Sequence, residues 1–157
     1  MMAWCVSLTS DLNKLCSRTW LERRLLLEAF VWLGLMRAAI LLLPFRFVVR
    51  IFRLHAGQPT ESCTSDRSNL ATPIGWAIRA AAARTPWESA CLGQALAGMA
   101  MLRRRGISGI IFLGVAKDAT VPQAMAAHAW LSSGDTILTG DGGHERYTVI
   151  SSFFWPA

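Results

Sequence analysis

Hydrophobic and polar residues follow two different repeats along the chain, and the change falls near Gly106. Before it, apolar residues recur at steps of three and four, which is the period of an α-helix. Residues 20–43 predict one long helix that ends before Pro44. Residues 73–84 predict a second helix. A third is predicted to begin near Ser89, whose hydroxyl would cap it, and to end at Gly106.

After Gly106 the pattern changes to short apolar runs and alternating residues, which are typical of β-strands. The turn signal Ser133-Gly134-Asp135 separates two of these runs and predicts a hairpin. Helices followed by strands that are close in sequence indicate an α+β fold, with helices packed on an antiparallel sheet. The predicted strands cover residues 109–115, 127–131, 136–139 and 146–154.

Composition and polarity suggest how these elements are organised. The chain has 157 residues, of which 53% are hydrophobic, so it can form one compact domain with a core. Polar residues with Gly, Ser, Thr and Pro fill positions 56–72, as in a linker. We therefore expect an N-terminal helical region at 1–55, a linker at 56–72 and the functional core at 73–157.

The net charge is +6, but no basic stripe interleaved with aromatics accompanies it, so we expect no nucleic-acid partner. The long helix at 20–43 is apolar enough to raise the question of a membrane span. It contains Glu28 and Arg37, and a central arginine costs about 2.5 kcal/mol or more on insertion. We expect a heavily buried helix of a soluble protein, with peripheral membrane attachment as the alternative.

Four cysteines are present, and no pair has a CxxC spacing. The N-terminus lacks a convincing secretory signal, so we expect a cytoplasmic protein with reduced thiols. Cys5, Cys16 and Cys63 have no special neighbours and are interpreted as incidental or buried.

Cys91 differs from the other cysteines because it lies in the first turn of a predicted helix. The partial positive charge and unpaired N–H groups of a helix N-terminus favour the reactive thiolate. His128, in a predicted strand, is the candidate base, since a cysteine and a histidine distant in sequence can meet in the fold. Trp87 would wall the cleft, and Gln94 would donate toward a bound carbonyl. Cys91 and His128 can also be interpreted as ordinary buried residues.

Asp141 is the candidate that would orient the imidazole. If the hairpin turns at Ser133-Gly134 or Gly134-Asp135, the residue opposite His128 is Thr139 or Asp141, and cross-strand neighbours lie about 5 Å apart. An ordinary turn aspartate is an equally good interpretation of Asp141, and Glu145 and His144 are weaker substitutes.

The order Cys, His, Asp resembles that of transglutaminase-like and papain-like cysteine hydrolases. In more detail the chain resembles the stand-alone B2 leader peptidases of lasso-peptide biosynthesis. The residues that carry this resemblance are 87–97, 101–107, 126–131 and 143–149, together with the helical stretch 20–47. The resemblance implies a transglutaminase/papain-like core in which a Cys-bearing helix packs on an antiparallel sheet.

The resemblance further implies cleavage of a ribosomal precursor peptide between its leader and core, with no cofactor. The implied partners are the precursor, a leader-recognition protein of B1 type and a lasso cyclase resembling asparagine synthetase. Three alternatives remain open from the residues: acyl transfer to an amine, a non-catalytic leader-binding module, and a metal site of Cys91, His128 and His144.

Overall fold

The computed structural model describes residues 19–57, 68–117 and 124–157. Within these ranges, all four α-helices and one short strand precede the other four strands, which confirms the predicted α+β fold. The helices are α2 (Trp20–Leu42), α3 (Phe45–Ile51), α4 (Ala71–Ala82) and α5 (Cys91–Arg103), with short 3-10 turns η1 (Ser68–Leu70) and η2 (His144–Arg146). The strands are β1 (His55–Ala56), β2 (Gly109–Lys117), β3 (Met125–Ser133), β4 (Thr136–Thr139) and β5 (Thr148–Trp155).

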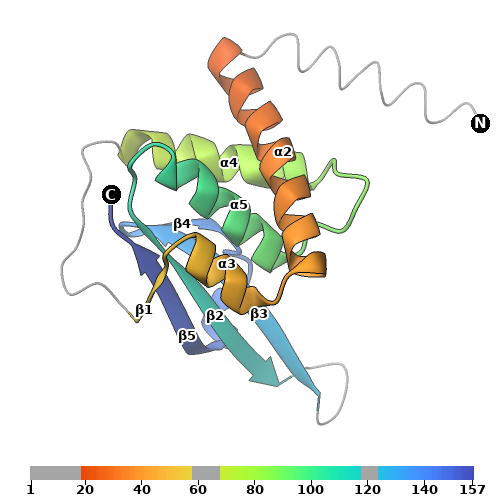
Figure 1. Ribbon diagram of the computed structural model, residues 1–157, viewed down its shortest axis with the longest axis vertical. Coiled ribbons are helices and arrows are strands. Elements are labelled where there is room, and N and C mark those ends of the chain that lie inside the picture. Colours follow the sequence, from red (N-terminus) through yellow and green to blue (C-terminus); the bar gives the residue numbers. More distant parts are fainter. Residues whose placement is uncertain (1–18, 58–67, 118–123) are drawn as a thin grey trace, which may run out of the picture.

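The strands form one antiparallel sheet in the order β1-β5-β2-β3-β4. Helix α5 packs on β2, β3 and β4, and α4 packs on β4. Helix α2 crosses the outside of α4 and α5 (Figure 1). The molecule is therefore layered as sheet, then α4 and α5, then α2.

Helix α2 begins with a capping box, in which the Thr19 hydroxyl accepts from the Glu22 N–H and the Glu22 carboxylate accepts from the Thr19 N–H. Its last turn stops before Pro44, as predicted. The expectation of a heavily buried helix was wrong, because only one stripe is buried: Leu25, Ala29, Leu33 and Met36. By length and composition alone α2 is the described helix that could cross a membrane. However, its buried stripe is packed on α4 and α5.

Glycines allow the helices to lie close to the sheet. A Cβ on Gly75 of α4 would lie 2.8 Å from the Leu138 carbonyl oxygen, and one on Gly98 of α5 would lie 2.4 Å from Leu131 Cδ2. The Trp155 indole N–H donates to the Ile107 carbonyl at 2.8 Å and fixes the end of β5 beneath the end of α5. These contacts enclose a single buried core between the sheet and the helices.

One strand was not predicted, and the bounds of several elements differ from the prediction by about two residues. Strand β1 was missed, since a two-residue strand has no periodicity of its own; it is defined by pairing with Phe153 and Phe154 of β5. Helix α4 starts at Ala71, inside the predicted linker. The remaining linker residues 58–67, like Cys5, Cys16 and Cys63, lie outside the described residues.

Candidate active site

Cys91 is the first residue of α5, which confirms the prediction that it lies in the first turn of this helix. The predicted cap was wrong, because the N-cap residue is Ala90, with extended backbone and no side-chain hydrogen bond. The Ser89 hydroxyl instead pairs with the Thr85 hydroxyl at 2.7 Å, which holds the preceding loop closed. The amides of the first turn of α5, including that of Cys91, are thus left without a capping side chain.

Gln94 lies one turn after Cys91 and ties the loop to the helix. Its side-chain amide donates to the Ser89 carbonyl at 2.8 Å. A carboxamide nitrogen carries two hydrogens, so one remains for another acceptor. The role of Gln94 as a donor toward a bound carbonyl stays a prediction.

Trp87 packs mainly on α2. Its ring lies 5.2 Å from that of Phe30, and a Cβ on Gly34 would lie 3.4 Å from it. Its indole N–H is buried without a hydrogen-bond partner in the described chain. A small cavity of about 140 Å³ lies nearby, between α2 and the start of α5. Leu33, Ile40 and Leu92 give it apolar walls. Trp87 therefore positions the loop against α2, and its predicted contact with substrate stays a prediction.

His128 lies in β3 and is held by a backbone group. Its Nε2 lies 2.8 Å from the Gly140 carbonyl oxygen. Because a carbonyl oxygen only accepts, Nε2 carries a hydrogen, and Nδ1 is the ring nitrogen left to exchange a proton with another group. The ring is stacked among aromatic neighbours, with centroids 4.9 Å from Tyr147 and 6.0 Å from Trp130.

The predicted hairpin register was wrong at His128. The pairs Ser133↔Thr136 and Ser132↔Ile137 fit a turn at Gly134-Asp135, but the register then shifts, so that Thr139 lies opposite Leu131. The ladder ends there, and the chain turns away at Gly140, whose φ is 76°. His128 consequently has no partner on β4.

Asp141 is exposed beyond this turn, and its carbonyl oxygen lies 2.9 Å from Nδ1 of His144. The group that holds the His128 ring is the carbonyl of the preceding residue, Gly140. The sequence could not show this, since any residue type supplies a carbonyl. A catalytic role for the Asp141 carboxylate stays a prediction.

Cys91 and His128 come from two elements that pack on each other, α5 and β3. Gly98, two turns after Cys91 on the same helix face, lies against Leu131, so Cys91 is on the helix face that meets the sheet. Alternation along β3 places His128 with Trp130 on the other face. No hydrogen bond joins Cys91 to His128 in the described ranges, so their pairing stays a prediction.

Within residues 19–57, 68–117 and 124–157, no group of three or more His, Cys, Asp or Glu residues could hold a metal ion, which argues against the metal site of Cys91, His128 and His144.

Thr139 is fully buried opposite Leu131, and its hydroxyl has no hydrogen-bond partner among the described residues.

Comparison with known proteins gives one match. Residues 39–152 match the transglutaminase-like superfamily, and this range includes α4, α5 and the strands from β1 to β4. Comparisons with curated proteins and with solved structures give no match. The superfamily includes cysteine proteases and acyltransferases. Because the match covers more than half of the chain, this protein belongs to the transglutaminase-like superfamily.

Proposed function

We propose that this chain is a cytoplasmic cysteine peptidase that removes the leader from a ribosomally made lasso-peptide precursor. The observation that carries the proposal is Cys91 at the start of α5, where no side chain caps the first-turn amides. An alanine is among the poorer N-cap residues and costs a helix about 1 kcal/mol relative to serine or aspartate. The uncapped amides can instead stabilise an oxyanion beside the thiol.

Membership of the superfamily and the resemblance to B2 peptidases over residues 87–97 and 126–131 support the same reaction. A separate leader-recognition protein would present the precursor, and a cyclase would use the amine that cleavage releases. These partners belong to the proposal.

The proposed reaction has two steps. The Cys91 thiolate attacks the scissile carbonyl carbon and forms a thioester as the C–N bond breaks, and the His128 imidazolium gives its proton to the leaving amine. Water then attacks the thioester carbonyl while His128 takes its proton, which releases the leader carboxylate and regenerates the thiolate. The Cys91 amide, with Gln94, would hold the oxyanion in both steps.

The reaction requires His128 to reach Cys91 from the far face of β3. The pairing of β3 with β4 ends at Leu131, so His128 lies beyond the paired part of this edge. The proposal therefore includes a movement of the imidazole past Gly140, which lies against this edge and accepts a hydrogen bond from the ring, when substrate binds. Catalytic hydrogen bonds that are long in a free enzyme commonly tighten in the substrate complex.

The test is incubation of the full chain with a precursor peptide and its recognition protein, followed by mass spectrometry. We expect a leader with a free carboxylate from the wild type, and none from folded Cys91→Ala or His128→Ala. Cys63→Ser is the matched control and should cleave normally.

Cleavage by Cys91→Ala would refute the proposal and favour the non-catalytic binding module. A leader–amine adduct in place of the free carboxylate would identify an acyltransferase instead.

A further inference from the structure

Helix α2 is apolar on its outer face as well as its inner one. Opposite the buried stripe, the side chains of Leu27, Val31 and Leu35 are 68%, 50% and 52% exposed. They recur at four-residue steps and so form one continuous stripe. The outer face of a surface helix is ordinarily polar, and a contiguous exposed apolar patch marks an interaction site.

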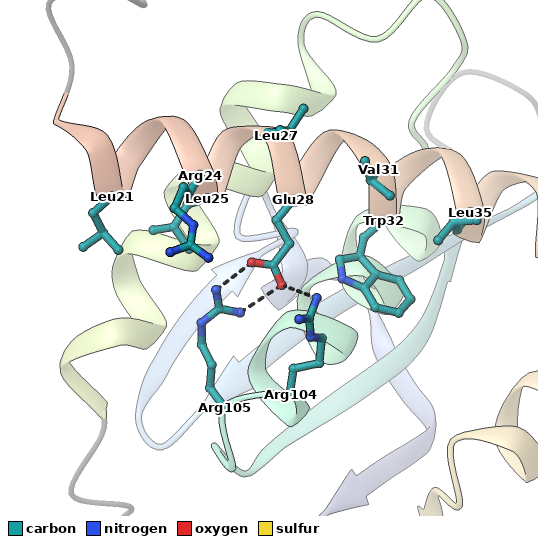
Figure 2. A pocket seen from close by; sticks show the side chains of 10 residues that line it. All are labelled: Leu21, Arg24, Leu25, Leu27, Glu28, Val31, Trp32, Leu35, Arg104 and Arg105. Atoms are coloured by element: carbon teal, nitrogen blue, oxygen red, sulfur yellow. Dashed lines mark hydrogen bonds and ion pairs between the residues drawn. The ribbon is translucent and has the colours of Figure 1, made fainter.

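This stripe borders a groove between α2 and the C-terminal end of α5, with a volume of about 730 Å³. Figure 2 shows Glu28 extending from α2 toward Arg104 and Arg105, with Trp32 beside them. The groove is large enough to receive several side chains of a bound helix.

The charged side chains in the groove indicate which sign of charge its occupant carries. Glu28 is engaged by Arg105 in a two-pronged ion pair, at 2.6 and 3.1 Å. Arg104 lies 3.3 Å from the same carboxylate but keeps 64% of its side chain exposed, and Arg24 stacks on Trp20 with its cation 4.5 Å from the ring centroid. Three arginines against one glutamate leave the groove positively charged.

We propose that this groove docks an acidic amphipathic helix of a partner protein. Apolar side chains of that helix would pack on Leu27, Val31 and Leu35, and its flanking carboxylates would face Arg24 and Arg104. This inference concerns a surface separate from Cys91 and does not depend on the proposed function.

Other occupants fit the charge or the shape less well. Residues 1–18 of this chain contain one Asp, one Lys and one Arg, so they have no net negative charge to match the groove. A second copy of the chain would present the same arginines. A lipid surface is flat, whereas this site is concave.

The test measures binding of the full chain to a fluorescent designed helix that has leucines on one face and glutamates beside them. A second peptide has lysines in place of the glutamates. We expect the acidic peptide to bind and the lysine peptide to bind at least about tenfold more weakly. Leu27→Glu should lower the affinity for the acidic peptide by at least about tenfold. Arg104→Glu should reduce the difference in affinity between the acidic peptide and the lysine peptide.

Ile150→Glu is the matched control, because Ile150 on β5 is 64% exposed and lies outside the groove. The proposal is overturned if neither peptide binds, if Leu27→Glu and Ile150→Glu bind alike, or if the two peptides bind equally. It is also overturned if Leu27→Glu abolishes either a dimer in sedimentation or the binding of phosphatidylserine vesicles, since the groove would then serve a second copy or a membrane.

Discussion

Gly140 is the residue whose replacement tests the local structure around His128 most sharply. Its φ of 76° is left-handed, and its carbonyl oxygen accepts from His128. A Cβ there would lie 2.5 Å from the Ala129 carbonyl oxygen and 2.9 Å from Trp130 Cβ. Both neighbours belong to β3, whose other edge is paired with β2, so the strand cannot easily move away.

Gly140→Ala should therefore incur two costs. A left-handed alanine costs about 1–2 kcal/mol, and forcing a methyl group into a filled site costs about 1–3 kcal/mol. The reduced freedom of the unfolded chain offsets about 0.4–1 kcal/mol. We expect the free energy of unfolding to fall by about 2–4 kcal/mol.

Two other glycines of the same region separate these costs. Gly134 has a φ of 56° but open space where a Cβ would stand, so Gly134→Ala should lose only the conformational part, about 1 kcal/mol. Gly142 has no left-handed φ and open space where a Cβ would stand, so Gly142→Ala should have the free energy of unfolding of the wild type within about 0.5 kcal/mol. Urea unfolding followed by circular dichroism gives all three values.

The cleavage assay adds a functional measurement. Because Gly140→Ala shifts the acceptor of the His128 ring, we expect it to slow cleavage under conditions where the protein remains folded. If Gly140→Ala is as stable as Gly142→Ala, the close approach of Gly140 to β3 is refuted. If folded Gly140→Ala cleaves as fast as the wild type, the role of the Gly140 carbonyl in positioning His128 is refuted.

Three further predictions concern single side chains. Thr139→Val replaces a buried unpartnered hydroxyl by a methyl group and should raise the free energy of unfolding by about 1 kcal/mol in urea titrations; a loss of stability would mean that the hydroxyl has a partner. Burial alone would raise the pKa of Glu28, but the hydrogen bond and charge of Arg105, with smaller contributions from Arg104 and Trp32, outweigh it and hold this pKa below 4.5. The carboxylate therefore stabilises the fold above pH 4.5 and loses this effect as the pH falls through the lowered pKa. Glu28→Gln should lower the free energy of unfolding by about 1 kcal/mol at neutral pH and have the same value as the wild type in acid. A difference in the free energy of unfolding that stays constant with pH would contradict this. In the cleavage assay, Asp141→Ala should lose less activity than His128→Ala, because an orienting group matters less than the base, and wild-type activity would remove Asp141 from the site.

The elements with strong periodicity could be predicted from the sequence. Helix α2 ends before Pro44, Cys91 lies in the first turn of α5, and β4 covers Thr136–Thr139, all as expected. These elements are determined by local signals, namely a proline, a run of helical spacing and a turn between apolar residues.

The details that depend on tertiary contacts could not be predicted. The register shift at Leu131 and the departure of the chain at Gly140 separate Asp141 from the position opposite His128, and no pattern of residue types reveals such a bulge. Serine is a preferred N-cap residue, but the Ser89 hydroxyl is hydrogen-bonded to the Thr85 hydroxyl and does not cap α5. The outer stripe of α2 is apolar like the inner one, so hydropathy alone could not distinguish the buried face from the exposed one.

The most direct test of the central claim is to trap the covalent intermediate. The full chain would be mixed briefly with precursor and recognition protein, quenched in acid, digested and sequenced by mass spectrometry. We predict that the leader fragment is attached to Cys91, as a thioester that accumulates on mixing and is absent from His128→Ala. A leader fragment on Cys5, Cys16 or Cys63, or cleavage that proceeds with no adduct on Cys91 at any time, would contradict the account.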